Sequence, residues 1–245
     1  MPVLWQYSFS NFNEKARWAL DFKQVAHERR SLLPGSPRAM AFSRSGGTLP
    51  VLDLAGERIV DSTRIIEALE RRFPQPALYP ADPDQRRHAL ELEEFFDEHA
   101  GHDMRRVGFW EIRDDPAYVA SFLATDQGRA AHAALRVAMP VGWQYVKRRY
   151  GFTEEAFQES QAALLKALER IEAERDGGDH LVGERFSVAD LTAAALLFPL
   201  AWPEQLQYDY PDPPDSEFRE SLSDHPAVGW IREVYRRYRG NSAAV

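Results

Sequence analysis

The chain has 245 residues, no cysteine and a formal net charge of −8, with 44% apolar and 28% charged residues. Its length exceeds the usual size of a single core, so we expect two domains that share an interface. The negative charge argues against a nucleic-acid partner. The lack of cysteine excludes disulfides, cysteine-ligated zinc and a cysteine nucleophile, so any thiol chemistry must use a thiol from a ligand.

The start of the chain and its most apolar run argue against export and against a membrane partner. Met1 to Tyr7 lack the basic start and apolar core of a signal peptide. The run from Leu191 to Trp202 is too short to cross a bilayer and is interrupted by Pro199. We therefore expect a cytoplasmic protein with no membrane partner.

The first third of the chain shows alternating strand and helix patterns. A capping-box pattern of Asn11 with Glu14 places the start of the first helix near Asn11. The expected elements, in order, are a strand from Val3 to Tyr7, a helix from about Asn11 to Gln24, a strand from His27 to Leu32, a helical turn over 38–42, a strand ending at Leu52, a strand starting at Arg58 and a helix over 62–73.

The stretch from Gly46 to Leu52 has features of a peptide-binding edge. Gly46 and Gly47 permit an unusual backbone entry into the strand, and Pro50 deletes one ladder donor and is typical of a bend or a cis bond. Leu49 would then offer its free N–H and C=O to an extended peptide. Ser62 lies at the next helix N-terminus, where unpaired N–H groups attract a carboxylate. Together these features predict a receptor for a short peptide with an acidic head.

The remaining two thirds of the chain carry almost exclusively helical patterns. The proline-rich segment 74–83 cannot continue a helix and is typical of an interdomain connector. Ser187 with Asp190 forms a capping-box variant preceded by a hydrophobic staple at Phe186, and its role is structural. Helical spacing is expected near 84–107, 116–149, 154–175, 187–200 and 226–239, and Pro140 is expected to kink or split the second of these.

Several of these motifs resemble the cytosolic glutathione S-transferase family. They are the 46–52 stretch with Asp61-Ser62, the opening Leu4 to Arg17 with its Lys-x-Arg, the Leu78-Tyr79-Pro80 connector, Gly183 to Asp190, and His225 to Ile231. The resemblance covers most of the chain except roughly 105–150 and 203–220. It implies an α/β thioredoxin-like, glutathione-binding domain over 1–75, a linker over 76–84 and an all-helical domain over 85–245.

The resemblance points to Ser10 as the residue that activates the glutathione thiol. Serine-type members have a serine there, where cysteine-type members have a cysteine. Tyr7 is the alternative, because other members use a tyrosine late in the first strand, although an ungapped match puts Gln6 at that position. A hydroxyl hydrogen bond of about 1.5–3 kcal/mol and a helix N-terminus worth about 0.3–1 kcal/mol lower a thiol pKa by about 1–3 units. The competing interpretation is that Ser10 and Asn11 merely cap the helix.

The family pattern also implies how glutathione is held. The Leu49 backbone beside Pro50 would bind the peptide, Ser62 and the helix N–H groups would bind the γ-glutamyl carboxylate, and Asp61 would face the ammonium group. For the glycyl carboxylate, Arg38 and Arg44 are the candidates. Thr48 stands where the family often has lysine or glutamine, so one long side-chain contact is missing.

The helical domain is expected to supply an apolar pocket for a second substrate. Met104, Phe109 and Trp110 are the candidates, with Trp143 and Tyr145, although packing inside a helix bundle is the favoured interpretation for any single one of them. His99 and His102 have ligand spacing on one helix face, but no third ligand cluster supports a metal, and we expect none.

The sequence therefore predicts a glutathione transferase that activates the glutathione thiol for attack on a hydrophobic electrophile, as in detoxification. The alternative is a non-catalytic glutathione S-transferase-like binding or interaction protein. The family is usually a two-fold dimer across the third helix and the first helix of the helical domain, so a homodimer is also predicted.

Overall fold

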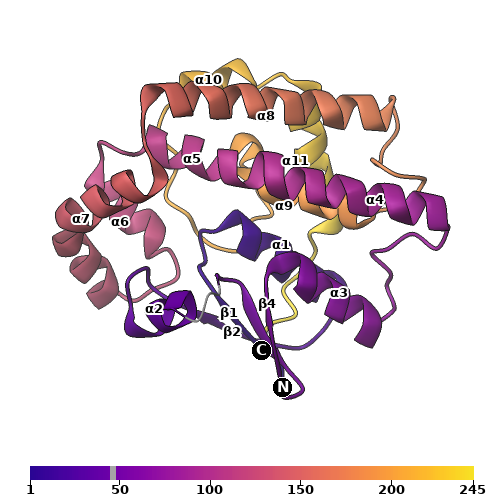
Figure 1. The fold of residues 1–245 in the computed structure, drawn as a ribbon, viewed down its shortest axis with the longest axis horizontal. Helices are drawn as coiled ribbons and strands as arrows, with labels where there is room; N and C mark the ends of the chain where they lie inside the picture. The colour runs from indigo at the N-terminus through magenta and orange to yellow at the C-terminus, as the bar shows by residue number, and fades with distance from the viewer. Residues whose placement is uncertain (45–47) are drawn as a thin grey trace.

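The computed structural model describes residues 1–44 and 48–245, without the side chains at positions 43, 44, 145, 149 and 150. Its N-terminal domain is a four-stranded mixed sheet flanked by three helices (Figure 1). The strands are β1 (Val3–Gln6), β2 (Glu28–Ser31), β3 (Val51–Leu54) and β4 (Glu57–Val60), and the helices are α1 (Asn11–Phe22), α2 (Pro37–Arg44) and α3 (Ser62–Arg72).

The sheet order is β2-β1-β3-β4, with β1 parallel to β2 and antiparallel to β3, and with β3 and β4 forming an antiparallel hairpin. This mixed order places the end of β1, the entry into β3 and the start of α3 at one edge of the domain. All three line the same cavity, described below.

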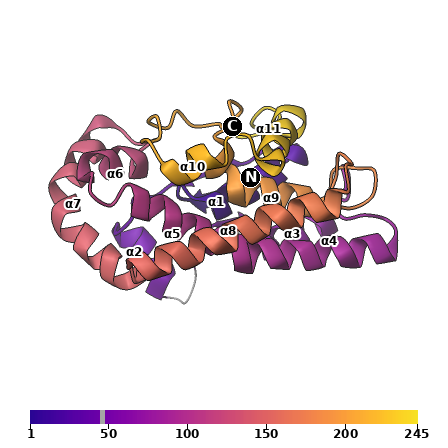
Figure 2. The same cartoon turned by 90° about the horizontal axis from the view of Figure 1, so that it is seen from above.

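The C-terminal domain is helical. Figures 1 and 2 show α8 running across its outer side and α9 in its interior. The side chains of α9 are buried all along its length except at Pro199, which explains why its sequence is apolar on every face. The helices are α4 (Pro83–Phe96), a π-helical segment η1 (Asp97–Gly101), α5 (His102–Glu111), α6 (Pro116–Leu123), α7 (Arg129–Tyr150), α8 (Glu154–Arg175), α9 (Val188–Ala201), α10 (Glu217–Ser221) and α11 (Pro226–Tyr238).

One continuous core joins the two domains. Trp18 and Leu20 of α1 belong to the same cluster of buried apolar side chains as Ile65 of α3 and Leu196 of α9. A second cluster, centred on Val119 and neighbouring residues, fills the space between α5, α6 and α7. Because α1 packs on both domains, the residues just before it lie at the interdomain cleft.

Most predicted elements are present, but some helix breaks and the cap of the first helix differ from the prediction. The pattern over 116–149 is broken at residues 124–128, between α6 and α7, whereas Pro140 lies inside α7. The expected capping box of the first helix does not form: the Asn11 amide donates to the carbonyls of Gly101 and Leu196 instead, and Glu14 pairs with arginines. The Asn11 Oδ1 still accepts the N–H of Phe12 at 3.0 Å, but the Asn11 amide nitrogen and the Glu14 carboxylate are engaged in tertiary contacts.

Candidate functional site

A cavity of about 790 Å³ lies between the two domains. One part of its wall comes from the N-terminal domain: the turn between β1 and α1, helix α2, the entry into β3 and the start of α3. The other part comes from α5, α6, α7 and the segment around α10. A ligand in this cavity therefore contacts polar main chain on one side and largely apolar helices on the other.

Ser10 lines the cavity directly before α1 and is half-buried. Its backbone has the extended conformation of an N-cap residue, with φ −83° and ψ 132°, yet its side chain makes no capping hydrogen bond. Among the described residues the Ser10 hydroxyl has no partner, so it is available to a ligand. The interpretation of Ser10 as a helix cap accounts for its backbone but not for its hydroxyl.

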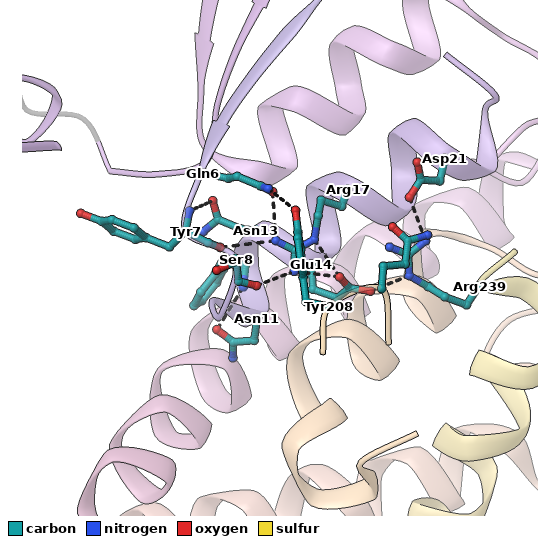
Figure 3. Close-up of polar contacts among 12 residues, drawn as sticks. Gln6, Tyr7, Ser8, Asn11, Asn13, Glu14, Arg17, Asp21, Tyr208 and Arg239 are labelled. Atoms are coloured by element: carbon teal, nitrogen blue, oxygen red, sulfur yellow. Dashed lines mark hydrogen bonds and ion pairs between the residues drawn. The ribbon is translucent and has the colours of Figure 1, made fainter. Parts of the chain in front are cut away.

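Tyr7, the alternative activating residue, also lines the cavity and is half-buried. Its ring stacks on Phe9 with the ring centroids 5.3 Å apart. Figure 3 shows its side chain extending away from the buried polar network behind the turn. The geometry thus brings both candidates, Ser10 and Tyr7, to the same wall.

The entry into β3 supplies exposed main chain. The Leu49–Pro50 peptide bond is cis, and Thr48, Leu49 and Pro50 all line the cavity. Neither the N–H nor the C=O of Leu49 is hydrogen-bonded to a residue in the described ranges, whereas the C=O of Pro50 accepts the N–H of Asp61 at 3.2 Å. Gly46 and Gly47 lie outside the described residues.

Asp61 and Ser62 have different hydrogen-bonding states at the start of α3. The exposed Asp61 carboxylate accepts the N–H groups of Thr63 and Arg64 at 2.9 and 3.2 Å and so caps the helix. Ser62 is 1% exposed, and its hydroxyl has no hydrogen-bond partner within the described part of the chain. Because Asp61 already occupies two helix N–H groups, a carboxylate ligand here would meet the N–H and hydroxyl of Ser62 itself.

A buried ion cluster fixes the start of α3 against the helical domain. Lys15 Nζ lies 2.9 Å from Glu93 and 2.7 Å from Asp97, and it donates to the Thr63 hydroxyl at 2.9 Å. Burial alone would lower the pKa of Lys15, but the two carboxylates outweigh it and raise this pKa. Sequence reasoning missed this cluster, because its members come from helices far apart in the chain.

Of the two candidate cations on α2, only Arg38 has a described side chain. Arg38 is exposed, is not a lining residue, and holds its guanidinium 4.0 Å from the centroid of the Trp5 ring. The Arg44 side chain lies outside the described part of the structure. On the same helix, the apolar Ala39 and Phe42 line the cavity instead.

Aromatic side chains line the helical part of the cavity wall. Met104 and Phe109 line the cavity as expected, as does Trp143, whose ring packs edge-on against Phe109 at 5.7 Å. Trp110 does not line it: its ring stacks on Phe157 of α8 at 5.3 Å. The side chain of Tyr145 is outside the described set. Phe9, which sequence reasoning missed, bridges the turn and this wall by contacts with Phe109 and Phe122.

The helical side of the cavity also carries charge. Glu111 lines it at the end of α5 and accepts a hydrogen bond from the Ser216 hydroxyl, and burial raises the pKa of Glu111. Arg219 lines it from α10 and donates to the carbonyl of Pro214. No local sequence motif predicts this pair, because Glu111 and Ser216 are 105 positions apart.

A buried polar network supports the turn that carries Ser10 (Figure 3). The fully buried Arg17 pairs with Glu14 at 2.8 Å, and Glu14 also pairs with the buried Arg239 at 2.5 Å. Burial alone would lower the pKa of Arg17, but Glu14 outweighs it and raises this pKa. The charges are thus retained inside the protein, directly behind the turn.

Within the described ranges, no three histidine, aspartate or glutamate side chains gather closely enough to hold a metal ion. His99 packs on Phe95 at 5.3 Å and His102 on Phe12 at 5.1 Å, between ring centroids. None of the helices in the described part of the chain is both long and apolar enough to traverse a bilayer.

Two family models match the chain. "Glutathione S-transferase, N-terminal domain" matches residues 4–77, and "Glutathione S-transferase, C-terminal domain" matches residues 135–228. Together they span more than half of the chain. A curated relative, "Probable maleylacetoacetate isomerase" from Caenorhabditis elegans, is 25% identical over 230 residues, which covers 92% of this chain and 90% of the relative.

Solved structures share the fold. A glutathione S-transferase from Rhodospirillum rubrum F11 superposes with a TM-score of 0.65 at 21% identity, over 98% of this chain and 90% of that chain. Another, from Methylobacterium radiotolerans JCM 2831 in complex with glutathione sulfonate, has a TM-score of 0.59 at 21% identity, over 99% and 94% of the two chains. Both likenesses concern the whole two-domain architecture.

Proposed function

Because the chain belongs to the glutathione S-transferase family, whose members use glutathione as a substrate, we propose that it is a serine-type glutathione transferase. Ser10 stabilises the glutathione thiolate, which attacks an apolar electrophile in the aromatic part of the cavity. One observation carries this proposal. The hydroxyls of Ser10 and Ser62 stand at the N-terminal ends of two helices beside one cavity, and neither has a partner among the described residues.

The tripeptide would lie along the N-terminal wall. The free N–H and C=O of Leu49 are suited to an extended peptide backbone. The N–H and hydroxyl of Ser62 would bind the γ-glutamyl carboxylate, and the exposed Asp61 carboxylate would accept the ammonium group. Arg38 and Arg44 remain the candidates for the glycyl carboxylate, and Arg38 would have to leave the Trp5 ring to reach it.

The proposed reaction requires the protein to lower the pKa of the glutathione thiol. The free thiol has a pKa of roughly 8.5, so little thiolate exists at neutral pH. One hydrogen bond to the charged sulfur contributes about 1.5–3 kcal/mol and the start of α1 about 0.3–1 kcal/mol, which together lower the pKa by about 1–3 units. The thiol proton leaves to solvent, the sulfur–carbon bond forms, and the leaving group departs with its electron pair. No covalent enzyme intermediate is needed.

Calorimetric titration of reduced glutathione into wild type and Ser62→Ala tests the site. We expect saturable binding by wild type that weakens strongly in the variant. Ser221→Ala, which removes an exposed hydroxyl on α10, is the control and should bind as wild type does. A folded wild type that does not bind glutathione overturns the proposal. Binding without turnover of any electrophile favours the alternative, a non-catalytic binding protein.

The relative named as a probable maleylacetoacetate isomerase favours a second candidate, glutathione-dependent isomerisation. In that reaction the thiolate adds to a carbon–carbon double bond that is conjugated to a carbonyl, the bond rotates, and the thiolate is expelled. Glutathione is regenerated, so the two candidates differ in consumption of thiol. Incubation with a cis-unsaturated dicarbonyl compound should yield the trans isomer without loss of free thiol if this candidate is right.

A further inference from the structure

Two side chains inside the protein donate hydrogen bonds to backbone carbonyls of the turn between β1 and α1. Arg17 Nη1 donates to the carbonyl of Tyr7 at 3.3 Å, and Arg17 Nη2 donates to the carbonyl of Ser8 at 3.0 Å. The Tyr210 hydroxyl donates to the same Ser8 carbonyl at 2.7 Å. Two consecutive carbonyl oxygens therefore point into the buried network (Figure 3).

Fixing the carbonyls also fixes the opposite ends of the same peptide units. In a planar trans peptide the N–H points away from the C=O of the preceding residue. The N–H groups of Ser8 and Phe9 must then point away from Arg17, and neither is hydrogen-bonded to a residue that the structure describes. On that side of the turn, Tyr7, Phe9 and Ser10 line the cavity.

This orientation has an electrostatic consequence for a sulfur anion near Ser10. Carbonyl oxygens facing the cavity would repel a thiolate, whereas N–H groups attract it, as in other backbone anion sites. The Arg17 guanidinium keeps its charge because Glu14 pairs with it at 2.8 Å, and Gln6 Oε1 accepts from it at 2.9 Å. The turn is thus held with its positive side outward.

We propose that Arg17 and Tyr210 are positioning residues for thiolate formation, which hold the Tyr7 and Ser8 carbonyls inward so that the Ser8 and Phe9 N–H groups and the Ser10 hydroxyl face the glutathione sulfur. This inference rests on the proposed glutathione site. The pKa of the bound glutathione thiol then depends on Arg17 and Tyr210, two side chains that touch neither the sulfur nor the tripeptide.

Tyr210 offers a clean test because its neighbour Tyr208 is a matched control. Tyr208 belongs to the same segment, and its hydroxyl also makes an interdomain hydrogen bond, from Gln6 Nε2 at 2.5 Å. It contacts neither turn carbonyl. Tyr210→Phe removes a hydroxyl that donates to the Ser8 carbonyl, whereas Tyr208→Phe removes one that accepts from Gln6. Both variants keep the ring, and with it the contact of the Tyr208 ring with the Arg17 guanidinium, 4.9 Å from the ring centroid. Arg17→Lys, which keeps the charge but not the two-pronged geometry, is the second test variant.

The readout is the thiol pKa of bound glutathione, followed by the ultraviolet absorbance of the thiolate as the complex is titrated. We expect Tyr210→Phe and Arg17→Lys to raise it by about half to one unit, with a roughly 3- to 10-fold loss of kcat/KM below that pKa. At acid pH, where the thiol is protonated, the affinity for glutathione should stay that of wild type. The charged or titratable groups that share the cavity wall are unchanged in all variants: Tyr7, Asp61, His102, Arg105, Arg106, Glu111, Tyr118 and Arg219.

The outcomes separate this inference from the proposed function. If the two test variants keep the wild-type thiol pKa, or if Tyr208→Phe moves it as far, the positioning role is wrong while the transferase proposal stands. If wild type binds no glutathione, both fall together. If Arg17→Lys does not fold, Tyr210→Phe decides alone.

Discussion

At the scale of single residues, Ser10 should separate activity from stability. Its hydroxyl makes no capping bond, so Ser10→Ala removes a contact to the ligand and none within the protein. We expect kcat/KM at pH 7 to fall roughly 10- to 100-fold, the equivalent of about 1.5–3 kcal/mol. The midpoint of urea unfolding should not move.

Thr153→Ala is the matching control. The Thr153 hydroxyl caps α8 by accepting the N–H of Ala156 at 3.1 Å, and Thr153 itself does not line the cavity, although its neighbour Phe152 does. Its loss should cost about 1 kcal/mol of stability and leave activity unchanged. If Ser10→Ala instead lost stability and kept activity, Tyr7 would be the next residue to test.

The sequence located some site residues better than others. Leu49 and Ser62 were predicted from local chemistry, a proline at a strand entry and a helix start, and Ser10 from the family resemblance; all three line the cavity, and their roles stay predictions. Arg38 and Trp110 were placed by proximity in the chain, and the fold turned both toward other aromatic rings. Contacts that join distant segments, such as Ser216 with Glu111, leave no local pattern to read.

At the scale of elements, α9 depends on one carboxylate. The fully buried Asp190 accepts the N–H of Leu181 at 2.8 Å, the N–H of Ser187 at 2.8 Å and the Ser187 hydroxyl at 2.9 Å. Asp190→Asn replaces one acceptor oxygen by an NH₂ group, which is a donor and therefore cannot accept a hydrogen bond from Leu181 or Ser187. We expect a loss of about 2–4 kcal/mol in the free energy of unfolding, measured in urea.

Asp82→Asn provides the comparison on an exposed helix start. Asp82 caps α4 by accepting the N–H groups of Asp84 and Gln85 at 3.1 and 2.9 Å, in contact with solvent. Asparagine caps a helix about as well as aspartate, so the change should cost well under 1 kcal/mol. Equal losses in the two variants would contradict the importance given to burial at Asp190.

The buried ion network behind α1 makes stability sensitive to acid. Burial alone would raise the pKa values of Glu14 and Asp21. Arg239 outweighs burial at both carboxyls, together with Arg17 at Glu14 and with Arg29 at Asp21. The pKa values of Glu14 and Asp21 therefore lie below their usual 4.5 and 3.8. A carboxyl whose pKa falls on folding gives stability that is complete above its unfolded pKa and is lost as the pH drops. We expect the free energy of unfolding to be level above about pH 5 and to decline below it.

Arg239→Met checks the origin of that decline. Removing the shared cation leaves two buried carboxylates poorly compensated, so stability at pH 7 should fall by roughly 3–5 kcal/mol. The decline on acidification should become shallower, because protonating Glu14 and Asp21 then forfeits less. Parallel pH profiles for variant and wild type would show that other groups cause the acid sensitivity.

Periodicity predicted where helices occur but not where they break. The 84–107 pattern is divided by the π-helical η1 segment, where Gly101 lets the Phe12 ring approach: a Cβ there would lie 2.5 Å from that ring. The 116–149 pattern is divided near Gly128. The first break accompanies the close approach of Phe12 from another helix, a contact that a one-dimensional pattern does not contain.

At the scale of the molecule, the two domains should unfold as one unit. The cluster that contains Trp18, Ile65 and Leu196 runs through both of them without interruption. We expect tryptophan fluorescence and far-ultraviolet circular dichroism to report the same urea midpoint and slope. Separate transitions would mean that the interdomain contacts are weaker than the shared core suggests.

We also propose that the protein forms a two-fold homodimer across α3 and α4, as the family does. The exposed side chains of these helices include Arg64, Glu67, Arg71, Glu91 and Glu94. An interface built on them is largely electrostatic, so it should weaken as salt screens the charges. Sedimentation velocity at low and high ionic strength should show a dimer that dissociates with added salt, and a monomer at low salt would contradict the proposal.

The position of Arg239 has a consequence for how the protein is made. Its partners Glu14 and Asp21 precede it by 225 and 218 residues, and buried carboxylates without a cation are costly. Domains usually fold as they leave the ribosome, N-terminal part first. Arg17 and Arg29 of the same domain already pair with these carboxylates, but Arg239, the cation that both carboxylates share, is translated more than two hundred codons later, so the buried network behind α1 is completed only once α11 has been made.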